Sequence, residues 1–328
     1  MANLRAGVIG IGSMGRHHAR IMREIEGVDL VAVADPGGDR FGVAKELPLG
    51  QSVDDLIAAG LDLAVVAVPT VYHEEVGLAL AEAKVPTMIE KPVAASSEAA
   101  GRLVEAFQAA GVVAAVGHVE RFNPAIAELR RRLQAGELGE VYQVATRRQG
   151  PFPSRISDVG VIRDLAVHDI NTTQWLAGAD YSQVAAQTAY RAGRDHEDMV
   201  AITARLGNGV LANHLVNWLS PIKERFTVVT GERGAFVADT AEVRLAFYAN
   251  GLVSSEWEPL RQFRGVSEGD MTRFALRTWE PLKAEDEAFR DAVLGTRQDI
   301  VTLEEGLKTL EAAEAALASA ATGQTVKL

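Results

Sequence analysis

The sequence predicts an α/β protein with two domains: a doubly wound parallel sheet, followed by an α+β domain with a large, mostly antiparallel open sheet. Over residues 1–120, short apolar segments alternate with amphipathic stretches. Near the start, a glycine-rich turn joins the first apolar segment to a stretch with helical periodicity. From residue 121 onward, longer runs alternate polar and apolar residues between glycine-containing turns. These observations divide the chain into a first domain, 1–120, and a second domain, 121–328.

The first domain is predicted to form five strands with helices between them. Mostly apolar strands separated by helices indicate a parallel sheet that is covered on both faces, and right-handed crossovers make such a sheet doubly wound. The strands are expected at residues 4–9, 30–34, 63–68, 86–89 and 112–116, and the helices at residues 14–25, 53–59, 72–83 and 97–110.

The second domain is predicted to begin with a helix over residues 121–133 and to continue as a sheet. Alternating polar and apolar residues are typical of strands with one buried face and one face that is open or packed on a partner. The strands are expected at residues 140–148, 184–190, 199–206, 210–218 and 225–230. A last helix over 303–320 starts at a capping box of Thr302 and Glu305 and is expected to be a packing helix that can return to the first domain.

Composition excludes several classes of function. The chain has 328 residues, with 33 Lys and Arg against 44 Asp and Glu, so its net charge is −11. Without a basic field, neither a nucleic acid nor an anionic membrane is an expected partner. The absence of cysteine excludes disulfides, thiolate nucleophiles and cysteine-ligated zinc. No apolar run approaches the ~18 residues of a membrane span and no signal peptide is recognised, so a cytoplasmic enzyme is expected.

The histidines lack the spacing of a metal site. His17 and His18 follow the glycine-rich turn and are expected on the helix surface or beside a phosphate group. His118, His196 and His214 are scattered along the sequence. No metal is therefore predicted.

The glycine-rich turn Gly10–Gly15 directly follows the first strand and predicts a dinucleotide site. Its three glycines allow a tight turn, the close approach of a phosphate and the packing of the helix on the strand. The helix then presents its N–H groups and the positive end of its dipole to a pyrophosphate. Asp35 ends the second strand, twenty residues after Gly15, where a carboxylate binds the ribose hydroxyls of NAD and disfavours NADP. The neighbouring Arg40 can soften this preference. The alternative is a structural turn with Asp35 as a strand-end cap.

Two further strand ends carry polar residues, and ligands of doubly wound sheets bind beyond the carboxyl ends of the strands. The third strand is followed by Pro69, Thr70 and His73, and the fourth by Glu90 and Lys91, which a proline follows. A lysine held between a strand end and a proline is positioned to donate to a hydroxyl oxygen or to the nicotinamide ribose. The alternative is an ordinary lysine in an exposed loop.

In the second domain, Asp164 and His168 are four residues apart, so on a helix they would be neighbours on one face. A carboxylate beside an imidazole fixes its tautomer and raises its basicity. Histidine is the side chain best matched to accepting a proton near neutral pH. The two residues are therefore a candidate catalytic pair, although the same spacing is also common in surface pairs.

Four motifs follow one another along the chain: Gly10-x-Gly-x-x-Gly15, Glu90-Lys91-Pro92, Arg121-Phe122-Asn123-Pro124 and Asp164-x3-His168. In this order and spacing they resemble the Gfo/Idh/MocA family of NAD(P)-dependent sugar and inositol oxidoreductases. The resemblance covers essentially the whole chain, including Gly231-x-x-Gly234 on a later strand. It implies that Lys91, Asp164 and His168 are catalytic. Within the family, residues 150–160 leading into 163–170 resemble the UDP-N-acetylglucosamine 3-dehydrogenase branch.

The expected site combines the strand ends with the residues that the resemblance implies. Cofactor binding is expected from Gly10, Gly12, Ser13, Met14, Gly15, Asp35, Arg40, Pro69, Thr70, His73, Glu90 and Lys91. Substrate binding is expected from Lys91, Arg121, Asn123, Arg155, Asp164 and His168. Arg155 would suit a diphosphate as a planar fork, and a solvated loop arginine is the alternative. Lys223 and Arg225 are interpreted as surface charges on a sheet edge.

Together these residues predict an NAD-dependent dehydrogenase that oxidises a secondary hydroxyl of a sugar, cyclitol or sugar nucleotide. His168 would take the hydroxyl proton, Lys91 would hold the oxygen and Asp164 would orient His168 or hold a neighbouring hydroxyl. Two alternatives are an NAD(P)-binding sensor of sugar metabolism without turnover, and a glycosidase that uses NAD transiently. The open sheet is expected to pack on a second subunit, which would give a homodimer or a homotetramer.

Overall fold

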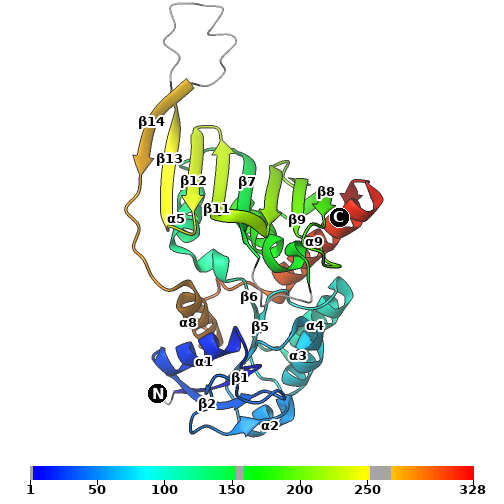
Figure 1. Ribbon diagram of the computed structural model, residues 1–328. Helices are drawn as coiled ribbons and strands as arrows, with labels where there is room; N and C mark the ends of the chain where they lie inside the picture. The colour runs from blue at the N-terminus through cyan, green and yellow to red at the C-terminus, as the bar shows by residue number, and fades with distance from the viewer. Residues whose placement is uncertain (1–2, 153–158, 252–266) are drawn as a thin grey trace, which may run out of the picture. The chain divides into compact units, whose positions relative to one another are not determined.

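The computed structural model describes residues 3–152, 159–251 and 267–328. Its contacts divide the chain into two compact units: unit 1 is Met1–Phe122 with Trp279–Glu311, and unit 2 is Asn123–Thr278 with Ala312–Leu328 (Figure 1). The chain first changes units two residues after the boundary that the sequence predicts. Residues 279–311, predicted within the second domain, group instead with unit 1. Within the described ranges, no helix is long and apolar enough to cross a membrane.

Unit 1 is built on a six-stranded sheet in the order β3-β2-β1-β4-β5-β6, in which every neighbouring pair is parallel. This order confirms the doubly wound sheet, with the reversal of strand order between β1 and β4. A crevice beyond the carboxyl ends of these strands is where such sheets bind ligands. The strands are β1 Leu4–Ile9, β2 Val28–Ala34, β3 Leu49–Gly50, β4 Leu63–Val66, β5 Thr87–Glu90 and β6 Ala114–Gly117.

Helices cover both faces of this sheet, and each face has its own apolar cluster. One cluster packs residues of α1 and α8 on the sheet, and Figure 1 shows these two helices side by side. The other cluster packs residues of α2, α3, α4 and the first turns of α9. The helices are α1 Gly15–Glu24, α2 Val53–Ala58, α3 His73–Glu82, α4 Ser97–Ala110, α8 Pro281–Val293 and α9 Leu303–Thr322, with short 3-10 turns at Thr70–Tyr72 and Val119–Phe122. The sequence pattern does not predict α8.

Unit 2 contains a nine-stranded sheet in the order β14-β13-β12-β11-β7-β10-β9-β8-β15. Among the described strands of this second sheet, only β7 and β10 pair in parallel, which confirms the mostly antiparallel sheet. The strands are β7 Val141–Pro151, β8 Tyr181–Ala189, β9 Met199–Leu206, β10 Leu211–Asn217, β11 Leu219–Gly231, β12 Gly234–Asp239, β13 Arg244–Gly251, β14 Ser267–Arg273 and β15 Val326–Lys327. The sequence pattern misses β12 to β14.

One face of this sheet forms the core of unit 2. In β9, burial alternates strictly, with Val200, Ile202, Ala204 and Leu206 buried and the residues between them exposed. The buried side packs on α5 Pro124–Gln134, α6 Val167–Ala177 and the later turns of α9. The predicted helix over 121–133 is confirmed from Pro124 onward, but its predicted start at residue 121 is wrong. The chain is extended at Asn123, because the residue before a proline disfavours the helical region, and α5 begins at Pro124.

Candidate active site

The glycine-rich turn of unit 1 has the geometry of a nucleotide loop between β1 and α1. Gly10 has φ +82°, and a Cβ there would lie 2.5 Å from the backbone nitrogen of Val68. A Cβ on Gly15 would lie 1.7 Å from the carbonyl oxygen of Gly10, so this glycine lets α1 pack against the turn. A Cβ on Gly12 would meet no atom within 4 Å. The turn is therefore closed against the sheet at Gly10 and Gly15 and open at Gly12.

Asp35 stands at the carboxyl end of β2 and connects this turn to the next loop. Its Oδ2 accepts the N–H of Ile11 at 3.0 Å, and its Oδ1 accepts the N–H of Gly37 at 2.7 Å. Arg40 is exposed in the same loop, and its Nη2 is 3.8 Å from the position of a Cβ on Gly37. An oriented carboxylate beside an open glycine turn fits the ribose end of NAD and would repel a 2′-phosphate.

His73 is buried where β4 leads into α3. Its Nδ1 is 2.9 Å from the carbonyl oxygen of Pro92, and its Nε2 is 2.9 Å from that of Val68. Burial lowers the pKa of His73, against the opposing effect of these two carbonyls. The imidazole thus joins the loop after β4 to the loop after β5. Of the neighbouring predicted residues, Pro69 is exposed and Thr70 is half-buried.

Lys91 follows β5 and is half-buried. Its N–H donates to Oε2 of Glu90 at 3.0 Å, and its peptide bond to Pro92 is cis. Glu90 is itself buried, and its Oε1 lies 3.0 Å from Nε2 of His18. Gly117 on β6 is the register partner of Glu90 on the neighbouring β5, and a Cβ on Gly117 would be 3.3 Å from Cδ of Glu90. The glycine leaves room for the carboxylate that holds the Lys91 backbone.

His18 has a different environment from the one its sequence position predicts. The expectation of a histidine on the helix surface is wrong, because the residue is 0% exposed and lies between Glu90 and Asp286. The partner Asp286 is 268 positions away in the sequence. No local pattern could have identified this contact.

In unit 2, Asp164 and His168 are both buried at the start of α6. The helical segment that holds them is not uniform, because Ile162–Ala166 forms a π-turn and α6 begins at Val167. The predicted i, i+4 relation therefore crosses a change of helix type. π-turns inside helices are often found at functional sites. Asp164 lies on the π-turn and His168 in the first turn of α6.

Glu197 fixes the start of this π-turn. Its Oε1 accepts the N–H of Ile162 at 3.0 Å, and the N–H of Val161 donates to its backbone carbonyl at 2.9 Å. Gly160 makes this approach possible, since a Cβ there would be 2.0 Å from Cδ of Glu197. Sequence patterns gave no reason to single out Glu197. The only local signal was Gly160, whose missing side chain allows the close approach of Glu197.

A buried ion pair joins the sheet to α6 next to these residues. Nε of Arg148 on β7 donates to Oδ1 of Asp169 at 2.9 Å, and both side chains are buried. Since breaking such a pair leaves an uncompensated buried charge, the pair fixes α6 against β7. The sequence reasoning did not single out either residue.

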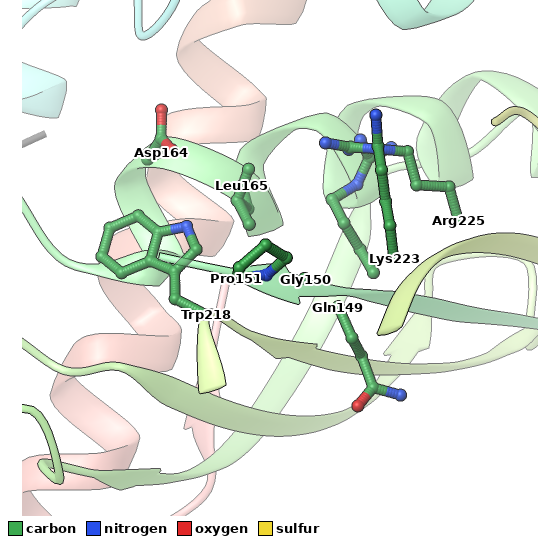
Figure 2. A pocket seen from close by; sticks show the side chains of 9 residues that line it. Gln149, Gly150, Pro151, Asp164, Leu165, Trp218, Lys223 and Arg225 are labelled. Atoms are coloured by element: carbon green, nitrogen blue, oxygen red, sulfur yellow. The ribbon is translucent and has the colours of Figure 1, made fainter. Parts of the chain in front are cut away.

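A cavity of about 250 Å³ opens beside this ion pair within unit 2. It is lined by Arg148, Gln149, Gly150, Pro151, Asp164, Leu165, Trp218, Lys223 and Arg225. Figure 2 shows Lys223 and Arg225 next to each other at one end and Trp218 and Asp164 at the other. Lys223 is exposed and Arg225 is half-buried, so both reach the surface as expected, and both also line this cavity. Lys223 lies within a shift of register in β11 between Leu219 and Glu224, and Arg225 directly follows it; local alternation does not reveal such a shift.

The remaining predicted residues lie in different parts of the chain. Arg121, in unit 1, is buried, and its Nη1 donates to Oε1 of Glu305 at 2.8 Å. Asn123, in unit 2, accepts the N–H of Ala125 and donates to the carbonyl of Thr240, so its amide caps α5. Arg155 lies outside the described residues. Among the residues that the structure describes, no group of three or more metal-ligating side chains comes together.

Comparisons with known proteins add to this geometry. Residues 4–118 match the model of the oxidoreductase family with an NAD-binding Rossmann fold, and residues 126–237 match the GFO/IDH/MocA C-terminal domain. Inositol 2-dehydrogenase 2 of Saccharopolyspora erythraea is 31% identical over 98% of this chain and 94% of its own. UDP-N-acetylglucosamine 3-dehydrogenase of Acidithiobacillus ferrooxidans is 37% identical over 65% of this chain.

The second of these matches spans 66% of the relative's length, slightly less than two thirds. A solved structure of the UDP-N-acetylglucosamine 3-dehydrogenase GnnA from the same organism is similar over the whole chain. It has a TM-score of 0.84 and 30% identity, and the similarity covers 97% of this chain and 98% of that one. The resemblance inferred from the four motifs is confirmed.

Proposed function

Because this chain belongs to the Gfo/Idh/MocA oxidoreductase family, we propose that it is an NAD-dependent dehydrogenase that oxidises a secondary hydroxyl of a sugar, cyclitol or sugar nucleotide. The observation that carries the proposal is the setting of Lys91. This residue follows a central strand of the NAD-binding unit, and its backbone is held by a buried carboxylate. A surface lysine in a plain loop would have no such support.

The residues of unit 1 fit NAD. The space at Gly12 admits a pyrophosphate next to the N-terminus of α1, and the Asp35 carboxylate meets the ribose hydroxyls. Bound NAD supplies the acceptor for the hydride that leaves the substrate carbon. Pro69 and Thr70 stand at the neighbouring strand end and border the nicotinamide half in this proposal.

Three side chains carry the proton chemistry in this proposal. His168 accepts the proton of the substrate hydroxyl at a ring nitrogen, and Lys91 donates a hydrogen bond to the same oxygen. Asp164 orients His168 or holds a neighbouring hydroxyl. A positioned base of this kind contributes ~10²–10⁴ in rate, or roughly 3–5 kcal/mol of barrier.

For the substrate we propose a sugar nucleotide, with UDP-N-acetylglucosamine oxidised at its 3-hydroxyl as the leading candidate. Two observations support this choice. The 37% identical relative acts on that compound by name, and the cavity of unit 2 has Lys223 and Arg225 at one end and Asp164 at the other. Cationic side chains suit the diphosphate, and a carboxylate suits sugar hydroxyls. A free cyclitol would not need Lys223 or Arg225.

The test follows NADH formation with UDP-N-acetylglucosamine, myo-inositol, glucose and glucose 6-phosphate. Lys91→Ala is expected to abolish turnover, whereas Lys308→Ala, an exposed lysine on α9, keeps it. Lys223→Ala is expected to raise KM for the sugar nucleotide and to leave kcat nearly unchanged. Turnover with myo-inositol alone would overturn the choice of substrate. Absence of turnover on the whole panel, with NADH still bound, would overturn the proposed activity.

We further propose that two copies pair through the open face of the nine-stranded sheet. Leu211 on β10, Tyr248 on β13 and Met271 on β14 belong to one line of paired residues that runs across the strands of this face. Their exposed fractions are 46%, 40% and 56%. Leu215, 48% exposed, lies on the same face of β10. Exposed apolar side chains on an open sheet face are candidates for contact with a second copy. A monomer by light scattering at micromolar concentration would contradict the homodimer, and so would a dimer that Leu215→Glu leaves intact.

A cytoplasmic location is also part of the proposal. Continuous turnover of a dehydrogenase needs other reactions that return NADH to NAD. Fractionation of the native host, with activity measured in each fraction, tests this location. Activity recovered outside the cytoplasmic fraction would contradict it.

A further inference from the structure

Unit 1 contains a buried row of ionisable side chains that ends at the backbone of Lys91. His18 on α1 lies between two carboxylates, with its Nε2 3.0 Å from Oε1 of Glu90 and its Nδ1 2.9 Å from Oδ1 of Asp286 on α8. The second oxygen of Glu90 accepts the N–H of Lys91 at 3.0 Å. His18 and Asp286 are both 0% exposed. Water therefore does not compete for these hydrogen bonds.

The two carboxylates determine the charge of His18. Burial by itself lowers the pKa of His18, but the charge and hydrogen bonds of Asp286 and Glu90 outweigh it and raise that pKa well above its ordinary value. Burial raises the pKa of Glu90, and the hydrogen bond and charge of His18 reverse this effect and lower it. Both ring nitrogens of His18 therefore carry protons and donate. Burial raises the pKa of Asp286, and the charge and hydrogen bond of His18 oppose this effect.

The other titratable groups around His18 do not compete with this arrangement. Glu285 on α8 is 2% exposed, and neither of its oxygens has a hydrogen-bond partner among the described residues. Burial, followed by the charge of Glu90, raises the pKa of Glu285 well above its ordinary value, which favours the neutral form of this acid. His17 is the titratable neighbour on α1 itself, and burial lowers its pKa. The charged groups that face His18 are thus Glu90 from β5 and Asp286 from α8.

Stability alone does not account for such a row. Buried charges carry a desolvation penalty that ion pairing often only balances, so apolar side chains of similar volume would serve the core as well. An apolar core could not hold a chosen backbone N–H group in place. The residues on either side of Lys91 are both held by a buried histidine, since His18 contacts Glu90 and His73 contacts the carbonyl of Pro92. The hydrogen bonds converge on one loop residue.

We propose that Asp286, His18 and Glu90 form a positioning relay for Lys91. Asp286 and Glu90 keep His18 protonated, His18 fixes the carboxylate of Glu90, and Glu90 fixes the backbone of Lys91. The relay rests on the proposed function, because Lys91 is the residue assigned there to the substrate oxygen. Asp286 and His18 touch neither the substrate nor NAD. They affect the reaction only through the position of Lys91 and through the charge of the adjacent Glu90 carboxylate.

The first experiment titrates His18 by imidazole NMR in the wild-type chain, in Asp286→Asn and in Glu285→Gln. In the wild type and in Glu285→Gln, His18 is expected to stay protonated through neutral pH. Asp286→Asn removes one of its two anions and should bring its titration down towards the ordinary value of about 6.5. Glu285→Gln replaces the buried acid that precedes Asp286 on α8 by an amide of the same size, and is therefore the matched control for α8. A wild-type His18 that titrates near its ordinary value would overturn the relay without any variant.

The second experiment measures kcat and KM against pH for the same proteins. Asp286→Asn should lower kcat about tenfold, as expected for weakening a hydrogen bond to a charged group, with KM for NAD unchanged within about twofold. Its kcat should also gain an ionisation at about pH 6 to 8 that the wild type lacks. Parallel pH profiles in the two proteins, or an equal change in Glu285→Gln, would refute the relay. If the wild type turns over no substrate, the proposed function fails, and the NMR titration decides the relay alone.

Discussion

The open space at Gly12 gives a direct test of the nucleotide loop. A Cβ on Gly12 would meet no atom within 4 Å, and its φ lies outside the left-handed region, so Gly12→Ala does not disturb the folded chain. Replacing glycine at such a position restricts the unfolded chain and stabilises a protein by about 0.4–1 kcal/mol. The same methyl group occupies the space that a pyrophosphate needs. Loss of one charge-assisted hydrogen bond, about 1.5–3 kcal/mol, would weaken NAD binding roughly 10- to 100-fold.

Thermal unfolding and NADH fluorescence titration measure the two effects separately. Gly12→Ala is expected to unfold at or slightly above the wild-type temperature and to bind NADH far more weakly. Gly15→Ala is the contrasting variant, because its Cβ would be 1.7 Å from the carbonyl oxygen of Gly10 and the turn cannot accommodate it. It is expected to lose stability first. Wild-type affinity for NADH in folded Gly12→Ala would refute the assignment of this turn to the pyrophosphate.

Three further substitutions test groups described above. Asp35→Ser removes the carboxylate next to Ile11 and should improve NADP binding relative to NAD; unchanged relative affinities, measured by titration with both cofactors, would argue against the ribose assignment. The pKa of Glu285 is raised in the folded chain, so as the pH rises above about 4.3 this carboxyl ionises in the unfolded chain first. The free energy of unfolding of the wild type should therefore fall above that pH. Urea unfolding of Glu285→Gln should show a smaller fall. Burial lowers the pKa of His214 to about 3. Stability should therefore fall as the pH drops from about 6.5, by ~2 kcal/mol at pH ~5, and His214→Gln should remove this loss; an unchanged acid branch would contradict a buried neutral His214.

Local patterns predict the sheet of unit 1 well because its strands are short apolar runs that end at glycine or polar residues. The first strand matches β1 Leu4–Ile9 and the fourth helix matches α4 Ser97–Ala110 at both ends. The capping box of Thr302 and Glu305 is confirmed by both of its hydrogen bonds. In each case the signal and the structure involve residues only a few positions apart.

The elements and contacts that sequence reasoning missed depend on distant residues. Helix α8 buries Glu285 and Asp286, so charged residues interrupt the apolar periodicity by which a packed helix is recognised. Strand β3 has two residues, too few for a pattern. Lys91 could be singled out from its place between a strand and a proline, whereas the role of His18 depends on Asp286, 268 positions later. The π-turn under Asp164 depends in the same way on the distant Glu197.

The composition of unit 1 has a consequence for the order in which the chain is made. Its sheet is complete by Gly117, yet Asp286 belongs to a segment that leaves the ribosome only after all of residues 123–278. Until then, His18 and Glu90 lack the third member of their buried row, and α1 packs on its face of the sheet without α8 beside it. A fragment that ends near residue 122 would stay in this unfinished condition. Chimeras that exchange the nucleotide-binding half between relatives should therefore carry residues 279–311 together with residues 1–122.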